Sequence, residues 1–379
     1  MIYVHIPFCR RFCSYCNFYS SIRTGKMPLL LEAIRNEWTL EKENWLTVWR
    51  GEPGFPRHTV YFGGGTPSLC PASALVDLCS IFRSDLAVCG LETDEITVEA
   101  NPSDLTAEYC RTLLTGGINR LSIGIQSFYD PILQEMRRRH SAQEAQDSFH
   151  TARKAGFSNI SIDLIFGFPN LTLSIWEDTL QRALHLKPEH ISAYQLSLEP
   201  GLAWAEKQKM LPEEDCAAQY AMLQKILQEN GYVQYEISSF SLPGAEARHN
   251  SAYWQRIPYL GLGPSAHSFN GHDRYWNKAD INHYITGISG KKPVRSYDRL
   301  SPYDVFNELI MLGLRTAKGI DLQAFREKAG DRNHTRLLEQ ATPFLQLGKL
   351  KKEGDRLAIP LHNLFTADSI IRDCLLLPE

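Results

Sequence analysis

The sequence lacks an excess of charge of either sign, and it lacks a long apolar run. Its 379 residues include 40 Lys and Arg against 43 Asp and Glu, a formal net charge of −3. Such a chain has no basic field to hold a nucleic acid backbone or an anionic membrane. No apolar run approaches the roughly 20 residues that span a bilayer, and residues 1–7 lack the charged and apolar regions of a signal peptide. The sequence predicts a soluble cytoplasmic protein without a nucleic acid partner.

Cysteine is present in an odd number that does not suit a disulfide framework. Nine cysteines in a reducing compartment are not expected to pair, so a clustered set points to metal binding or catalysis. Hydrophobic residues make up 43% of the chain, enough for a large core. The length suits about two domains.

The first half of the chain repeats a β-branched or aromatic run, a break and a stretch with helical periodicity. This alternation predicts a parallel sheet with helices outside it, and six units predict an open, partial (β/α)6 barrel rather than a closed one. The expected strands are Ile2–Ile6, Thr59–Phe62, Glu95–Val98, Arg120–Ile125, Asn159–Phe166 and His190–Leu196. The expected helices are Leu29–Trp45, Ala72–Arg83, Ala107–Leu114, Ala142–Ala155 and Thr172–Leu186.

The pattern changes after residue 210. We expect the barrel over residues 1–210, an aromatic-rich connecting segment over 211–295, and a small helical and winged domain over 296–379. Ser301 and Pro302 suit the N-cap and first position of a helix, and Lys351–Leu357 suits a hairpin. The basic residues of that hairpin are too few to indicate nucleic acid binding.

Cys9, Cys13 and Cys16 follow the first strand with C-x3-C-x2-C spacing. Three soft thiolates favour an iron–sulfur cluster or zinc over hard cations. A structural zinc site would need a fourth ligand, for which His5 is a candidate, whereas a [4Fe–4S] cluster on three cysteines leaves one iron open to another ligand. The spacing therefore indicates a reactive site, with zinc as the alternative.

Polar or glycine residues also follow the next four strands. The second strand ends in the glycine-rich loop 63–67, the third at Glu99, and the fourth at Gln126, which the basic run 137–139 follows one helix later. Asp163 lies inside the apolar fifth strand, where a carboxylate needs a partner or a ligand. Because these strand ends meet at one mouth of a parallel barrel, the sequence predicts a small-molecule site there.

These motifs together resemble the radical S-adenosylmethionine (SAM) superfamily, and over nearly the whole chain they resemble its oxygen-independent coproporphyrinogen dehydrogenase (HemN) group. The resemblance implies that the three cysteines hold a [4Fe–4S] cluster whose open iron binds SAM. By the same likeness Tyr3, Gly64 and Glu99 contact that SAM. Gly65, Thr66, Gln126, Arg138 and Asp163 match residues that hold a second SAM in the dehydrogenase.

Three departures favour the related HemW group of heme chaperones over the dehydrogenase. Phe18 stands where the dehydrogenase has a fourth cysteine, and the first strand begins at Ile2 without the dehydrogenase's long N-terminal extension. Residues 249–254 match the H-N-x-x-Y-W motif of the chaperones, which implies His249 as a heme ligand. The plainer interpretation of the motif is a surface loop whose histidine is only hydrogen-bonded. His267 lies in the same aromatic-rich region and is the second candidate for the heme ligand.

The resemblance implies a heme chaperone that passes heme to an acceptor hemoprotein, for example a membrane-associated respiratory one. An electron donor such as flavodoxin or ferredoxin is implied only if SAM is cleaved, which the sequence leaves open along with the number of bound SAM molecules and a homodimeric state. The alternative function is oxidative decarboxylation of coproporphyrinogen III.

Overall fold

The computed structural model describes residues 1–51, 57–197 and 210–376, and it forms two compact units. The first unit contains Met1–Cys216 and Pro258–Asp298, and the second contains Ala217–Ile257 and Arg299–Glu379. The structure thus divides the expected connecting segment 211–295 between the two units. In the described residues no helix is both long and apolar enough to cross a membrane.

The first unit is built on a parallel sheet whose strands follow the chain in order. These strands are β1 (Ile2–Ile6), β2 (Arg57–Gly64), β3 (Glu92–Ala100), β4 (Arg120–Gln126), β5 (Ile160–Phe166) and β6 (His190–Gln195). Each pairs in parallel with the next, which confirms the α/β class and the predicted strands. The far edge of β1 pairs with a further strand, β9 (Leu260–Leu262), so the sheet stays open between β1 and β6.

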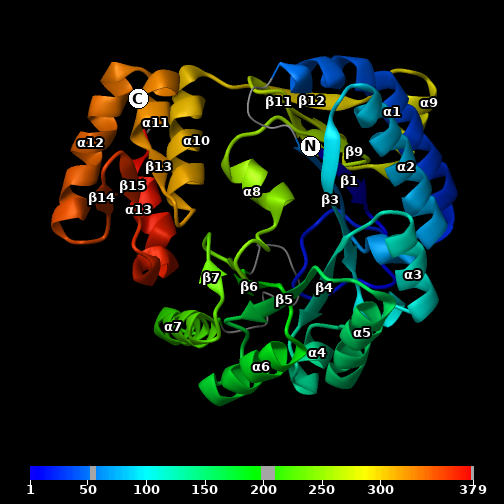
Figure 1. Cartoon of the computed structure of the whole chain (residues 1–379), viewed down its shortest axis with the longest axis horizontal. Coiled ribbons are helices and arrows are strands. Elements are labelled where there is room, and N and C mark those ends of the chain that lie inside the picture. The colour runs from blue at the N-terminus through cyan, green and yellow to red at the C-terminus, as the bar shows by residue number, and fades with distance from the viewer. Residues whose placement is uncertain (52–56, 198–209, 377–379) are drawn as a thin grey trace. The chain divides into compact units, whose positions relative to one another are not determined.

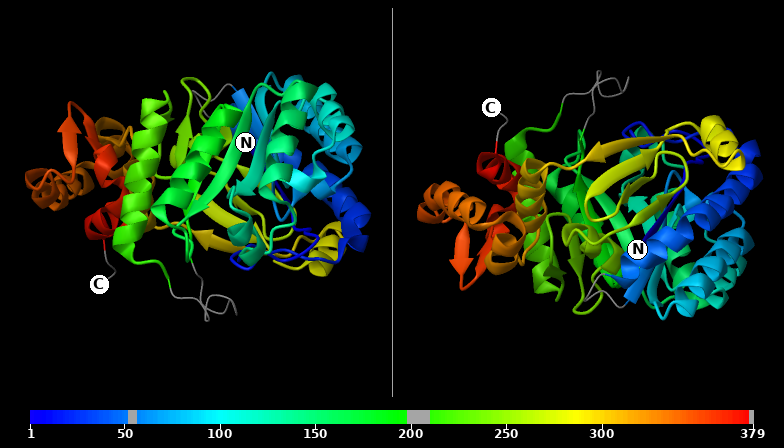
Figure 2. Two further views of the ribbon diagram at one scale, coloured as in Figure 1. Left: turned by 90° about the horizontal axis from the view of Figure 1, so that it is seen from below. Right: turned by 90° about the horizontal axis from the view of Figure 1, so that it is seen from above.

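Helices follow these strands and lie along the sheet (Figures 1 and 2). They are α1 (Met27–Arg50), α2 (Ala72–Val88), α3 (Ala107–Thr115), α4 (Asp130–Glu135), α5 (Ala142–Ala155) and α6 (Leu173–Leu186). Side-chain caps explain several starts: Thr106 and Thr172 each accept a backbone N–H at the head of α3 and α6, and Ser141 forms a capping box with Glu144 on α5. Short 3-10 turns lie at Pro67–Leu69 and Pro102–Asp104.

The returning segment of the first unit is tied to α1 by a buried carboxylate. Besides β9 it contains β10 (His267–Phe269), β11 (Asp273–Asn277), α9 (Ile281–Ser289) and β12 (Arg295–Arg299). Glu37 accepts hydrogen bonds from Gly263 N at 2.9 Å, Tyr284 Oη at 2.6 Å and Arg295 Nη2 at 2.9 Å. Because a fully buried carboxylate needs such partners, Glu37 fixes the end of β9 beside β1.

The second unit contains most of α7 (Glu213–Glu229) and the short helix α8 (Arg248–Trp254). The other elements of the unit are β7 (Val233–Gln234), β8 (Ser239–Ser241), α10 (Pro302–Leu314), β13 (Ile320–Asp321), α11 (Leu322–Ala329), α12 (Asp331–Gln346), β14 (Lys351–Glu353), β15 (Arg356–Ala358) and α13 (Ala367–Cys374). Ser301 caps α10 in a capping box with Asp304, and Pro302 is its first residue, as predicted. β14 and β15 form the expected hairpin.

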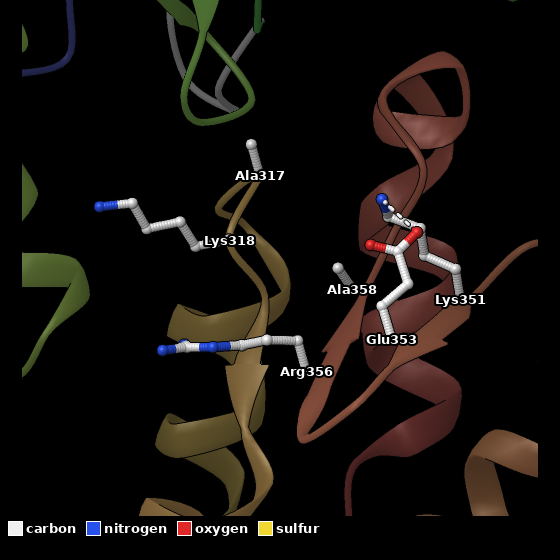
Figure 3. A pocket seen from close by; sticks show the side chains of 6 residues that line it. All are labelled: Ala317, Lys318, Lys351, Glu353, Arg356 and Ala358. Atoms are coloured by element: carbon white, nitrogen blue, oxygen red, sulfur yellow. Dashed lines mark hydrogen bonds and ion pairs between the residues drawn. The ribbon is translucent and has the colours of Figure 1, made fainter.

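The wing hairpin borders a hollow of about 280 Å³ (Figure 3). Its lining residues are Ala317, Lys318, Lys351, Glu353, Arg356 and Ala358. Lys351 Nζ lies 3.1 Å from a carboxylate oxygen of Glu353, and Arg356 Nη2 lies 3.1 Å from one of Asp321. These carboxylates offset much of the local positive charge.

Candidate cofactor site

The cysteine motif forms a loop that backbone hydrogen bonds anchor at the end of β1. Cys9 N donates to Ser21 O at 3.0 Å, and Ser21 N donates to Pro7 O at 2.6 Å. Cys9, Cys13 and Cys16 are half-buried free thiols. They lie near enough that each negative charge raises the pKa of a neighbouring thiol. The loop thus brings the predicted ligands together.

Burial is the main influence on the protonation of the Cys9 and Cys16 thiols. Burial raises the pKa of Cys9 and of Cys16, against the lowering effect of the nearby Arg138 cation. Thr66 Oγ1 also donates to Cys9 Sγ at 3.5 Å. Both thiols are therefore protonated at neutral pH in the free protein, and metal binding releases their protons. Among the described residues no group of three or more His, Cys, Asp or Glu could hold a single metal ion. A [4Fe–4S] cluster does not require such a group, because each of its three cysteines binds a different iron atom.

The glycine-rich loop after β2 comes so close to the cysteine loop that side chains do not fit. A Cβ on Gly65 would lie 3.0 Å from Cys9 Sγ and 2.8 Å from Phe8 O. A Cβ on Gly64 would lie 2.8 Å from the His5 ring, and Gly64 has φ of +113°. The missing side chains at Gly64 and Gly65 thus let the glycine-rich loop pack directly against His5 and the cysteine loop.

Glu99, near the end of β3, is bonded to the glycine-rich loop. Its Oε1 accepts from Tyr61 Oη at 2.9 Å and its Oε2 accepts from Gly64 N at 3.2 Å. Burial is the main cause that raises the pKa of Glu99 to about 7, and the negative charge of Asp163 adds to it. Glu99 therefore titrates near neutral pH.

Tyr3 and His5 form a second polar pair on β1. His5 Nε2 lies 3.1 Å from the carbonyl oxygen of Tyr19, which only accepts, so Nε2 carries the proton. His5 Nδ1 then accepts from Tyr3 Oη at 3.1 Å. Burial lowers the pKa of His5 to about 4, so the ring is neutral. Both nitrogens are engaged, and this arrangement does not present His5 as the fourth zinc ligand.

The ends of β4 and β5 bring the remaining predicted residues to the same mouth. Gly124 lies opposite Asp163 in the sheet, and Ser122 Oγ donates to Asp163 at 3.2 Å. Burial raises the pKa of Asp163 to about 6. The β4 ladder is irregular between Gly124 and Gln126, and Gln126 has φ of +72°. Arg138 reaches both this strand end and the cysteine loop.

The two candidate heme ligands lie in different units. His249, on α8, is 1% exposed, and its Nε2 lies 3.0 Å from Tyr253 Oη. His267, on β10 of the first unit, is exposed and stacks on Trp276 with ring centroids 5.3 Å apart. His249, which the motif indicates as the heme ligand, is thus buried, whereas His267 is exposed.

Sequence reasoning missed two polar residues of the barrel interior. Tyr61 donates to Glu99, and Arg120 is 2% exposed and lowers the pKa of Asp163. The sequence did contain a signal for them, because residues two apart in a strand point to the same face of the sheet. Tyr61 lies two residues before Gly63, and Arg120 lies two residues before Ser122.

Comparison with known proteins identifies the family of the chain. The radical SAM superfamily model matches residues 3–183, and the HemN C-terminal domain model matches residues 300–364. The fold and the cysteine loop thus define a radical SAM protein with a HemN-type C-terminal domain. A solved structure, coproporphyrinogen III oxidase (HemN) from Escherichia coli, superposes with a TM-score of 0.80 at 20% identity, over 98% of this chain and 89% of that one. At that identity it supports the fold alone.

Two relatives with the same name identify the family within the radical SAM superfamily. Heme chaperone HemW of Bacillus subtilis is 36% identical over 86% of this chain and 86% of its own length. Heme chaperone HemW of Synechocystis sp. is 32% identical over 100% of this chain and 92% of its own. The chain therefore belongs to the HemW family of radical SAM proteins. Membership of the superfamily implies a [4Fe–4S] cluster and SAM as cofactors.

Proposed function

We propose that the protein binds heme and transfers it to an acceptor hemoprotein, and that it carries a [4Fe–4S] cluster on Cys9, Cys13 and Cys16. The observation that carries this proposal is the match, over most of the chain, to relatives named heme chaperone HemW. Phe18 supports the chaperone function over the dehydrogenase, because this phenylalanine, which is 68% exposed, stands where the dehydrogenase has its fourth cysteine.

We assign SAM to the mouth of the barrel. Tyr3, Gly64 and Glu99 line the position for the SAM on the cluster, where Glu99 can accept hydrogen bonds from an amino group. Gly65, Thr66, Gln126, Arg138 and Asp163 are assigned to a second SAM. Bound to the cluster, SAM supplies the capacity for one-electron cleavage to a radical. The chain's own residues supply hydrogen bonds and exclude water.

We assign heme ligation to His249. Ligation of iron through His249 Nε2 requires the hydrogen bond to Tyr253 to open. Heme titration of the purified protein tests this assignment. His249→Ala should weaken the Soret shift, whereas the control His267→Ala should leave it unchanged. The opposite pattern would transfer the assignment to His267.

Two assays separate the other candidate functions. Anaerobic incubation with reductant, SAM and coproporphyrinogen III should give no appreciable protoporphyrinogen, and its formation would establish the dehydrogenase instead. Iron and acid-labile sulfide should be present in equal amounts after anaerobic purification. Zinc without sulfide would make the protein a zinc-stabilised binding module.

A further inference from the structure

One turn of the chain holds both the cysteine loop and Arg138. After the end of helix α4, Arg137 has φ of +56°, and Arg138 N donates to Leu133 O at 2.8 Å, a Schellman-type end that reverses the chain. On the same turn Ser14 Oγ donates to Glu135 O at 2.9 Å and Ser14 N donates to Met136 O at 3.2 Å. Cys13 and Arg138 are thus attached to one rigid feature.

The guanidinium of Arg138 is fixed on the side away from the thiols. Its Nη2 donates to Gly124 O at 2.5 Å, at the irregular end of β4. The residues around it are anchored as well: Arg139 forms a two-pronged ion pair with Asp104, and His140 Nε2 lies 3.0 Å from Ile125 O. A guanidinium held in this way loses little rotamer freedom when it meets a further acceptor.

Another nitrogen of this guanidinium faces the cysteine loop. Arg138 Nη1 donates to Cys13 Sγ at 3.5 Å, and the same cation lowers the pKa of both Cys9 and Cys16. The buried phenol of Tyr15 interacts with Cys13 and with Arg138. Arg138 Nε is buried and has no hydrogen-bond partner among the described residues. The cation is therefore directed at the cluster ligands.

We propose that Arg138 is a positioning residue for the cluster, which donates a charge-assisted hydrogen bond to the Cys13 sulfur and thereby raises the reduction potential of the [4Fe–4S] centre. Reduction adds negative charge to the cluster and its thiolates. A fixed cation and N–H donor at one of those sulfurs stabilises the reduced form more than the oxidised form. This role rests on the proposed cluster but does not need the second SAM to which the same residue is assigned.

The test is an anaerobic redox titration of the cluster-loaded protein without SAM. The electron paramagnetic resonance (EPR) signal of the reduced cluster measures the extent of reduction at each potential. Arg138→Met should make the reduction equilibrium about tenfold less favourable, a fall of about 59 mV for one electron. Arg138→Lys keeps the positive charge but not the fixed geometry of the guanidinium. Its reduction potential should therefore lie between those of the wild-type protein and Arg138→Met. The matched control is Arg11→Gln, which removes an exposed arginine of the same loop and should change the potential far less.

Iron and sulfide analysis keeps the two claims separate. A wild-type protein that assembles no cluster contradicts the proposed function. A cluster-loaded Arg138→Met with the wild-type potential overturns this inference, as does an equal shift in Arg11→Gln. Should Arg138→Met not assemble, pulsed EPR of the wild-type protein with ¹⁵N-labelled arginine decides. A ¹⁵N coupling to the reduced cluster, lost in Arg138→Lys, is the expected result, and the absence of any coupling refutes the contact.

Discussion

SAM binding should depend on pH through Glu99. At a pKa of about 7, roughly a tenth of the molecules carry ionised Glu99 at pH 6 and about nine-tenths do at pH 8. The amino group of SAM donates hydrogen bonds, so under the proposed assignment it favours the carboxylate. The affinity for SAM should therefore rise about tenfold between these pH values. Because burial raises this pKa, the ionised form is lost as the pH falls through 7.

Anaerobic calorimetric titration with SAM at a series of pH values measures this dependence. Tyr61→Phe removes a donor to the carboxylate, so the pKa should rise and the profile should move to higher pH. Glu99→Gln retains every other titrating group, including those of SAM, and should bind weakly with a much flatter profile. An unchanged slope in Glu99→Gln would refute the reasoning, because another group would then carry the dependence.

Three further changes test other parts of the structure. Gly65→Ala should lower the iron and sulfide content because its Cβ meets Cys9, whereas Gly25→Ala, with nothing within 4 Å, should not; equal contents would argue against the close approach. Asp104→Asn weakens the ion pair with Arg139 and should cost roughly 2–3 kcal/mol in chemical denaturation, and an unchanged midpoint would contradict it. Tyr253→Phe should tighten heme binding about fivefold by removing the hydroxyl that competes with iron for His249 Nε2, and unchanged affinity would count against that competition.

Much of the first unit is predictable because its elements are local. β-Branched or aromatic runs and capped amphipathic helices are visible in the sequence, and the predicted ends of Ile2–Ile6 and Ala142–Ala155 match β1 and α5. Strand β9 was not predicted. It has only Leu260–Leu262, too short for a period, and it forms by pairing with β1, which is distant in the sequence. That pairing draws residues 258–298 into the first unit.

The site shows the same division between local and tertiary information. The motif spacing located the cysteines, the glycine loop and Glu99. It did not reveal that burial brings the pKa of Glu99 to about 7, nor that Tyr61 is its partner, because burial is a property of the folded barrel. The H-N-x-x-Y-W motif located His249 but did not reveal that this side chain is buried and bonded to Tyr253. The burial of a side chain on α8 depends on the surrounding unit, which the motif does not describe.

The central claim is that one chain carries both a cluster and heme. The most direct measurement is an absorbance titration of the anaerobically reconstituted protein with heme, with iron and sulfide determined on the same sample. The account predicts a saturable Soret band at a fixed heme-to-chain ratio while the cluster absorbance persists. Cluster-containing protein that shows no saturable Soret change would contradict the account.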